Sequence, residues 1–92
     1  MYIVKQSSER ALRIRPPKVA SELPLPSNIG KEFPFKALAV GQSFYLHYCE
    51  NIPYQFSLVK ERINRYNKLY AVCFVAIKHN DAPKRLEIAR IF

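Results

Sequence analysis

Cysteine and histidine are the residue types of this sequence that could hold a zinc ion, and there are two of each: His47, Cys49, Cys73 and His79. Cys73 and His79 lie six residues apart in a segment typical of a strand, which would separate them by about 20 Å. Zinc ligands lie about 2.0–2.3 Å from the ion, so these two side chains cannot share one. His47 and Cys49 alone do not complete a structural site. We therefore expect no metal and no other cofactor, with Cys73 in the core and both histidines at the surface or at strand ends.

A base, a nucleophile and an acid also stand close together at His47, Cys49 and Glu50. Nucleophilic catalysis needs such groups to face one another. In an extended strand, alternation directs His47 and Cys49 to one face and Glu50 to the other. With Gly30 and Gly41 as the only glycines, the sequence has no glycine-rich loop that could hold a phosphate. These observations favour a protein that is not an enzyme.

The net charge of +8 is concentrated in two parts of the sequence. Residues 1–20 carry five bases and one acid, residues 21–56 two bases and three acids, and residues 57–92 eight bases and three acids. A field of this sign attracts polyanions such as nucleic acid, an anionic membrane or an acidic protein. A basic surface that only keeps the protein soluble is the alternative.

The second basic region contains the clearest helix of the sequence, over residues 57–68. Val59, Ile63 and Tyr66 recur at i, i+4 and i+7, which is typical of the buried stripe of an amphipathic helix. Ser57 is the expected N-cap. The cationic and amide side chains that would then face away from the protein, with Arg62 at the rim, are Lys60, Asn64, Arg65 and Lys68.

Such side chains on an exposed helix can contact phosphates and base edges. Two alternatives exist for the same helix. It could be a solvated face stabilised by the i,i+4 pair of Glu61 and Arg65. It could also lie on a membrane surface, which the narrow apolar stripe disfavours.

The first basic region carries a group of cations that could act together: Arg10, Arg13, Arg15 and Lys18. Residues 11–15 alternate apolar and cationic side chains, which predicts a strand whose Leu12 and Ile14 face the protein. Arginine makes bidentate contacts with phosphate and carboxylate, so this strand would suit an anionic ligand. The alternative is a solubilising edge strand that prevents unwanted pairing.

The remaining elements are expected to be strands. Residues 2–5 form one, and residues 42–48 form another, with Phe44, Leu46 and Tyr48 on one face and Tyr45 and His47 on the other. Residues 69–78 are apolar at nearly every position and predict a strand buried on both faces. A turn at 79–83 leads to a returning strand over 84–92. The fold class is α+β, a small antiparallel sheet of about three to five strands packed on one helix, with a basic N-terminal arm.

The 92 residues are expected to form a single domain. Residues 1–20 would be the basic strand-forming arm, residues 21–33 a proline-rich connection, and residues 34–92 a strand–helix–hairpin core. We expect this arm, or a partner subunit, to cover the second face of the sheet. Neither a secretory signal nor an apolar segment of the ~20 residues needed to cross a membrane is visible. Two cysteines in so small a protein suggest reduced thiols, and so a cytoplasmic location.

The segment over residues 34–44 reads PFKALAVGQSF. It resembles the PF-x-x-L-x-V-G-x-S-F opening of small domains encoded by bacteriophages and plasmids. In those domains a strand, a basic helix and a C-terminal hairpin ending near an arginine follow, an order that residues 57–68 and 84–90 match. The likeness covers residues 34–92. Family members often carry a tryptophan near the final arginine, where this chain has Ile88, Ala89 and Arg90.

The resemblance implies a phage or mobile-element origin more than an activity, because the function of the family is poorly defined. A phage origin also favours one class of function, the small inhibitors of host defence, which include anti-CRISPR proteins. In a phage protein, the cytoplasm would be that of the host cell.

Two functions follow from these features. The first is a non-enzymatic phage-type protein that binds nucleic acid or a nucleoprotein surface through the basic helix and the arm, using Arg10, Arg13, Arg15, Lys60, Arg62, Arg65 and Lys68. The second is an inhibitor of a host defence complex that acts by protein–protein contact, with Tyr45 and Tyr70 as exposed aromatic anchors. No membrane partner is expected, and both a monomer and a dimer remain open.

Overall fold

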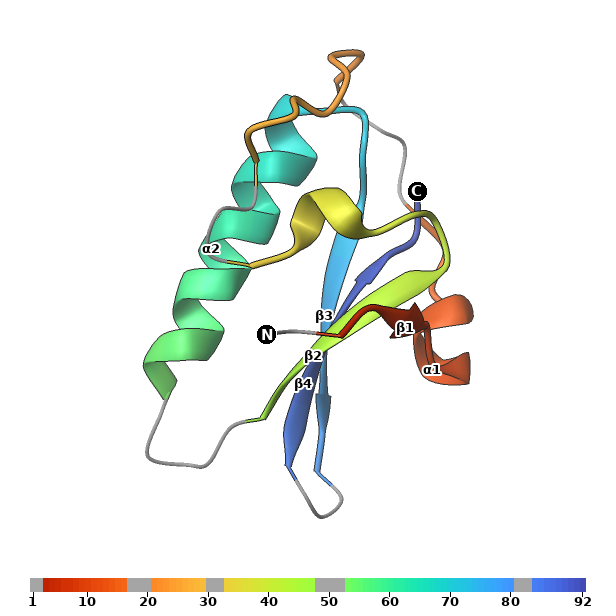
Figure 1. Ribbon diagram of the computed structural model, residues 1–92, viewed down its shortest axis with the longest axis vertical. Coiled ribbons are helices and arrows are strands. Elements are labelled where there is room, and N and C mark those ends of the chain that lie inside the picture. The colour runs from red at the N-terminus through yellow and green to blue at the C-terminus, as the bar shows by residue number, and fades with distance from the viewer. Residues whose placement is uncertain (1–2, 17–20, 30–32, 48–52, 81–83) are drawn as a thin grey trace.

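The fold is an antiparallel four-stranded sheet with the strand order β1-β2-β4-β3, packed against one long helix. The computed structural model describes residues 3–16, 21–29, 33–47, 53–80 and 84–92. Figure 1 shows the long helix on one side of the sheet and a short helix on the other. The elements in chain order are β1 (Lys5–Gln6), α1 (Glu9–Leu12), the 3-10 turn η1 (Phe35–Ala37), β2 (Gln42–His47), α2 (Pro53–Leu69), β3 (Phe74–His79) and β4 (Arg85–Arg90). The predicted α+β class, with a small antiparallel sheet packed on one helix, is confirmed.

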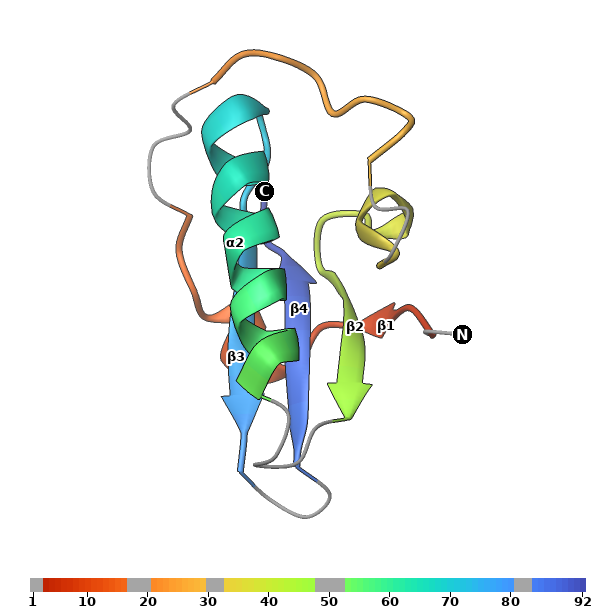
Figure 2. The same ribbon diagram turned by 90° about the vertical axis from the view of Figure 1, so that its left-hand side faces the viewer.

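The main core lies between α2 and the sheet (Figure 2). Val59 and Ile63 from α2 meet Phe44, Leu46 and Ile88 of the sheet, all of them buried. The predicted inward stripe of the helix and the alternation of β2 are therefore confirmed. Tyr48, which was assigned to the same face of β2, lies outside the described residues.

The helix α2 begins earlier than predicted, at Pro53 instead of at an N-cap on Ser57. Proline is favoured in the first turn of a helix because the N–H that it lacks would have no partner there. Ser57 therefore lies inside the helix, on its exposed side. At the other end Tyr70 donates its N–H to Tyr66 O at 2.9 Å, which closes the last turn.

β4 is the central one of the three long strands, and it pairs with β2 on one side and with β3 on the other. Its four middle residues are all buried because both faces of the sheet are covered at this strand. The prediction that residues 69–78 form the doubly buried strand is wrong. Their first residues complete α2 and the connection after it, where Val72 and Cys73 are buried, and β3 starts only at Phe74 and lies at the edge.

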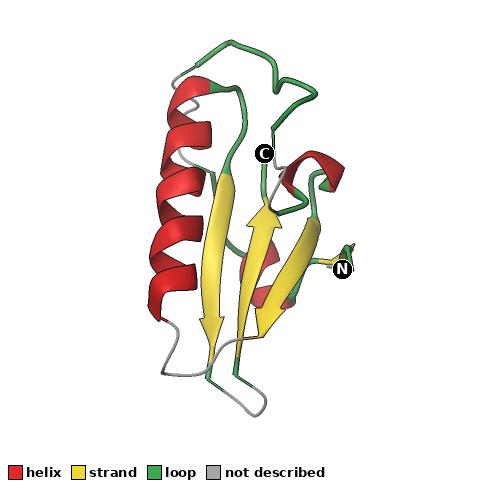
Figure 3. Cartoon of the chain, turned by 60° about the vertical axis from the view of Figure 1, so that its left-hand side comes forward, coloured by secondary structure: helices red, strands yellow, loops and turns green. Residues whose placement is uncertain are grey.

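The second face of the sheet is covered in part by α1 (Figure 3). Ala11 is fully buried there against Ile77 and Ala89. The predicted strand over residues 11–15 is wrong, because Ser8 caps a short helix by accepting the N–H of Ala11 at 3.3 Å. Leu12 is consequently 51% exposed instead of facing the protein. Of the strand predicted over residues 2–5, Lys5 belongs to β1, and Tyr2 lies outside the described residues.

A tight turn over residues 39–42 connects η1 to β2. Gln42 donates its N–H to Ala39 O at 3.0 Å. Gly41 is the third residue of this turn, and its φ of 88° is the positive value that a type II turn requires there. Gly41 also donates to Arg90 O at 2.8 Å, so the turn is fixed to the central strand. The segment over residues 34–44 therefore has a structural role, since Phe35, Leu38 and Phe44 fill the core around this turn.

Replacing Gly41 with alanine should lower the free energy of unfolding by about 1 kcal/mol, because an L side chain strains the backbone at positive φ. A Cβ at this position would meet no atom within 4 Å, so the loss is conformational and not steric. Gly41→Asn should lose less, since asparagine tolerates the left-handed region better. Urea denaturation of both variants measures the difference. Equal losses for the two variants would contradict the assignment to backbone strain.

Candidate functional site

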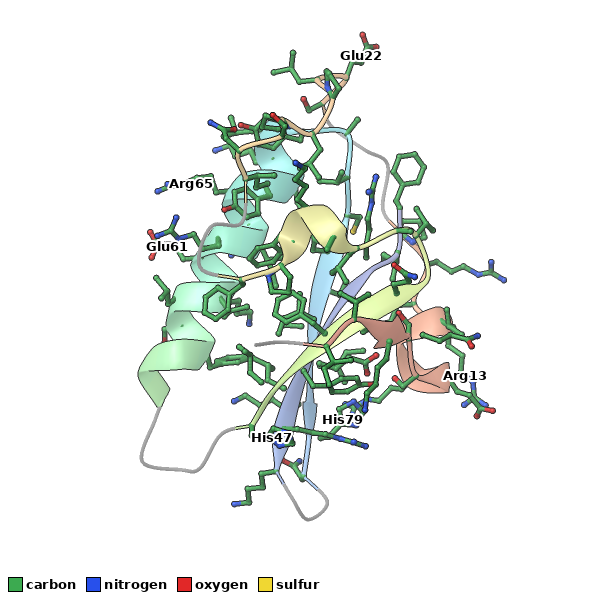
Figure 4. All side chains as sticks on the ribbon, in the orientation of Figure 1. Arg13, Glu22, His47, Glu61, Arg65 and His79 are labelled. Carbon is green, nitrogen blue, oxygen red and sulfur yellow. The ribbon has the colours of Figure 1, made fainter. Side chains whose placement is uncertain are left out.

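The outward face of α2 is basic. Lys60, Asn64, Arg65 and Lys68 are exposed, and Arg62 is half-buried at the rim, as the helical period predicted. Arg65 Nη2 lies 3.8 Å from Glu61 Oε1, an i,i+4 pair with both side chains more than half exposed. Figure 4 shows Arg65 and Glu61 directed away from the sheet. Such an exposed pair stabilises a protein by less than about 1 kcal/mol, so Arg65 remains available to an anionic ligand.

The arginines of the N-terminal region lie on the opposite side of the sheet from this face. Ile88 of β4 packs in the α2 core and the next residue, Ala89, packs against α1, so the two helices cover opposite faces. Arg13 and Arg15 are exposed there, with Arg13 Nη2 3.7 Å from Glu9 Oε2. The structure therefore does not join these two arginines and α2 into one surface. Lys18, which was grouped with them, lies outside the described residues.

Arg10 departs from its neighbours because it reaches the edge of β3. Its Nη1 donates to the carbonyl oxygen of Lys78 at 2.9 Å. The side chain of Lys78 is on the α2 side of that strand, where its Nζ lies 4.0 Å from the centroid of the Phe56 ring. Lys60 Nζ lies 5.4 Å from the same centroid. Lys60 and Lys78 thus share one aromatic ring at the border between α2 and β3, and Arg10 contacts the backbone of the same strand.

Lys78 was not among the predicted site residues, although a local pattern indicates its position. Phe74, Ala76 and Lys78 alternate along β3, and the first two pack in the α2 core. The same alternation places Lys78 on the helix side of the strand. Phe56 and Lys60 are spaced i,i+4 on α2, so they share one helix face.

The two tyrosines predicted as exposed anchors are both half-buried. The ring of Tyr45 packs against the guanidinium of Arg85, with 5.1 Å between the guanidinium carbon and the ring centroid. Burial, reinforced by the nearby Glu87 carboxylate, raises the pKa of Tyr45 above its ordinary value. Tyr70 packs against the main core beside Tyr66, 6.4 Å between ring centroids. The prediction of exposure is wrong for both, because strand β2 and the end of α2 are covered where these rings lie.

A buried polar cluster, centred on Glu87 of β4, lies on the face opposite α2. Glu87 Oε2 accepts the N–H of Ser8 at 2.9 Å and the hydroxyl of Ser43 at 2.8 Å. Its Oε1 accepts the hydroxyl of Ser8 and lies 2.8 Å from His79 Nε2. Ser7 and Ser43 also hydrogen-bond to each other at 2.7 Å. The carboxylate therefore ties β2, β3 and the N-cap of α1 to the central strand.

Glu87 is fully buried, and its charge is maintained by these hydrogen bonds. Burial by itself would raise the pKa of the carboxyl, but the donors on Ser8, His79 and Ser43 outweigh it and lower the pKa below its ordinary value. A catalytic triad needs a serine that donates to the histidine. Here the Ser8 hydroxyl and His79 both hydrogen-bond to the carboxylate of Glu87. The serine does not donate to the histidine, so these bonds stabilise the fold and do not form a triad.

The sequence patterns did not predict this cluster. His79 was expected at the surface or at a strand end, and it is the last residue of β3, where its side chain is 14% exposed. His79 pairs with Arg85 and Ile77 with Glu87, so His79 and Glu87 are diagonal neighbours across the hairpin. A correct hairpin register would have revealed this pair. The serines could not have been found in this way, since Ser8 is 79 residues away in the sequence.

The remaining candidates for chemistry are few. Cys73 is buried, as predicted, and burial raises the pKa of its thiol. His47 is exposed at the end of β2, and Cys49 and Glu50 lie outside the described residues. The described residues contain no group of three or more histidine, cysteine or acidic side chains that could hold a metal ion.

Within the described part of the chain, no helix has the length and apolar character needed to cross a membrane. Comparison of the sequence and the structure with protein-family models, with curated proteins and with solved structures gave no match.

Proposed function

We propose that the protein is a non-enzymatic binding protein that recognises duplex nucleic acid, free or within a nucleoprotein, through the outward face of α2. The observation that carries this proposal is the position of α2. Its apolar stripe packs against the sheet, and its opposite face therefore exposes Lys60, Arg65 and Lys68 beside a single acid, Glu61. A cationic helix that stands on the surface of a small domain can enter the major groove of a duplex.

The spacing of the polar side chains on α2 supports this proposal. Lys60, Asn64 and Lys68 follow one another at i, i+4 and i+8, so they form one line along the exposed face. In this arrangement the two lysines would contact phosphates on either side of Asn64. An asparagine amide is suited to the paired donor and acceptor of an adenine edge.

A duplex fits the described surface better than a single strand. Proteins that bind single strands stack the bases on exposed aromatic rings. Among the aromatic side chains whose exposure the structure describes, only Phe92 is exposed, while the others are half-buried or buried. A single ring does not make a row of stacking positions, so contacts to the backbone of a duplex are favoured.

The resemblance of residues 34–44 to phage and plasmid domains supports a phage-type origin for this activity. A phage protein of this kind could use the same basic face against a host defence complex that carries nucleic acid. That second function, inhibition by contact with a protein complex, becomes the better account if free duplex is not bound.

Titration of a labelled duplex at several salt concentrations tests the proposal. With about four phosphates neutralised, log K should fall against log salt with a slope of roughly −3 to −4. The double variant Arg65→Glu, Lys68→Glu should weaken binding to all sequences by roughly tenfold or more, because phosphate contacts carry no sequence information. The matched control is Arg13→Glu, Arg15→Glu, which reverses two exposed charges on the opposite side of the sheet and should change binding far less.

Two outcomes would contradict the proposal. One is the absence of duplex binding at low salt, which removes direct recognition of nucleic acid. The other is an equal loss of affinity in the two double variants, which would show that the net charge acts and not the face of α2. A single strand bound more tightly than the duplex would reject the duplex as the preferred ligand.

A further inference from the structure

We infer that Lys60 and Lys78, whose ammonium groups both lie over the ring of Phe56, form a phosphate-binding site at the border of α2 and β3. The inference rests on the proposed function in one respect: in the complex, the phosphate would belong to the backbone of the bound duplex. The site itself is defined by its own geometry, and its ligand chemistry is that of a phosphate anion.

The position of α2 against β3 is fixed by the side-chain amide of Asn67, which hydrogen-bonds to the backbone of Phe74 as a neighbouring strand would. The amide of Asn67 donates from Nδ2 to Phe74 O at 2.9 Å, and its Oδ1 accepts the N–H of Phe74 at 2.8 Å. Both backbone groups of Phe74 are thereby satisfied at the open edge of the sheet. The chain reverses direction between α2 and β3, so Lys60, seven residues before Asn67, lies near Lys78, four residues after Phe74.

The ammonium groups of Lys60 and Lys78 both lie over the ring of Phe56. Lys78 Nζ is 4.0 Å and Lys60 Nζ is 5.4 Å from the centroid of this one ring. The face of an aromatic ring attracts cations, and a phenylalanine ring offers no hydrogen-bond acceptor. Within the described ranges neither ammonium group has a hydrogen-bond acceptor, so the three donors of each can bind a ligand.

The charges of the site are not balanced by the described part of the protein. In the described ranges no carboxylate oxygen lies within 4.0 Å of either ammonium group, and the nearest acid on the helix, Glu61, pairs with Arg65. Two like charges closer than the screening distance of about 8–10 Å repel each other. An anion that contacts both ammonium groups would replace this repulsion with two attractions, so the site favours a ligand such as phosphate.

Arg10 adds a third cation to this border. Its guanidinium is anchored through Nη1 to the backbone oxygen of Lys78, and the fork has four further N–H donors. Arg10 comes from α1, on the far face, and so it extends the basic surface of α2 around the edge of β3. A duplex lying along α2 could then be contacted on one strand by Arg65 and Lys68 and on the other by this border.

The inference is tested with inorganic phosphate and with duplex. In NMR spectra of the parent protein, millimolar phosphate should cause saturable shifts of the Phe56 ring and of the Lys60 and Lys78 side chains, while sodium chloride of equal ionic strength should not. Lys78→Gln should abolish the saturable response, and Lys78→Arg should retain it. In the duplex titration, Lys78→Gln should make the slope of log K against log salt shallower by about 0.9.

The matched control is Lys5→Gln, which removes an exposed lysine from β1 at the other edge of the sheet and should leave both readouts unchanged. Melting temperatures of all variants establish that the fold is retained. Two results overturn this inference and leave the proposed function standing. One is the absence of a saturable shift in the parent. The other is an unchanged salt slope in Lys78→Gln while the Arg65 and Lys68 reversal still weakens binding. Phosphate shifts in a protein that does not bind duplex support the site and reject the proposed function.

Discussion

Replacement of Glu87 with glutamine should lower the free energy of unfolding by about 3 kcal/mol at neutral pH. The parent carboxylate accepts four hydrogen bonds in a fully buried position. A glutamine amide has nearly the same volume but only one acceptor oxygen, so it turns an NH₂ group toward donors on Ser8, Ser43 or His79. Urea denaturation at pH 7 measures the loss. Glu22→Gln, which changes an exposed carboxylate, is the control and should have almost no effect.

The effect of this substitution should depend on pH in a defined direction. The pKa of Glu87 is lower in the folded protein than in the unfolded chain, so the unfolded chain binds more protons as the pH falls. The stabilisation by the charged carboxylate is therefore complete well above the ordinary pKa of 4.5 and is lost as the pH falls through the folded pKa below it. The difference in stability between the parent and Glu87→Gln should shrink between pH 6 and pH 3. A difference that stays constant over this range would show that folding does not change the pKa of Glu87.

Replacement of Phe35 with alanine should cost about 3–5 kcal/mol of stability. The ring is 1% exposed and lies edge-on to Phe44, Tyr66 and Phe74, with centroid distances of 5.5, 5.1 and 5.2 Å. It is the residue through which η1 contacts both the sheet and α2, so its removal leaves a cavity between all three. A domain of this size has a total stability of about 5–15 kcal/mol, so the variant should be partly unfolded well below the melting temperature of the parent.

Phe92→Ala is the matched control for Phe35→Ala, because it makes the same chemical change at a ring that is 47% exposed. It should change stability by less than about 0.5 kcal/mol. Calorimetric melting of the two variants side by side gives the comparison. Similar losses at the two positions would mean that Phe35 is not at the centre of the core.

The elements with a strong local pattern were predictable from the sequence. The i, i+4, i+7 stripe of Val59, Ile63 and Tyr66 and the alternation of β2 are properties of single segments, and both are found in the structure. Which strand is central is not a local property. Residues 69–78 and 84–92 are both apolar enough to be buried, and only the pairing of β4 with two neighbours decides between them.

The short helix α1 was not predictable from periodicity, because four residues do not complete two turns. The deciding features were the capping serine, Ser8, and the acid that follows it, Glu9, whereas the alternation of Leu12 and Ile14 with arginines suggested a strand.

The candidate site was predictable to the extent that it lies on one helix. The exposure of Lys60, Arg65 and Lys68 follows from the period of α2. Lys78 and Arg10 join the same border only through tertiary structure, since the hydrogen bond between them spans 68 residues of sequence. The buried carboxylate of Glu87 was missed for a related reason, because its serine partners, Ser8 and Ser43, are 79 and 44 residues away in the sequence.

The hydrogen bonds between Ser8 and Glu87 also determine when the protein can complete its fold during synthesis. The two residues are 79 positions apart, so the ribosome must add β2, α2 and β3 before the carboxylate exists. Ala11 packs against Ile77 and Ala89, which are synthesised later than α1. The residues of α1 therefore leave the exit tunnel before the surface on which they dock has formed. Pairings of such long sequence separation form slowly, because the chain entropy of a large loop is lost before any contact offsets it. The N-terminal segment is thus translated before both strands that it covers, and it docks after them.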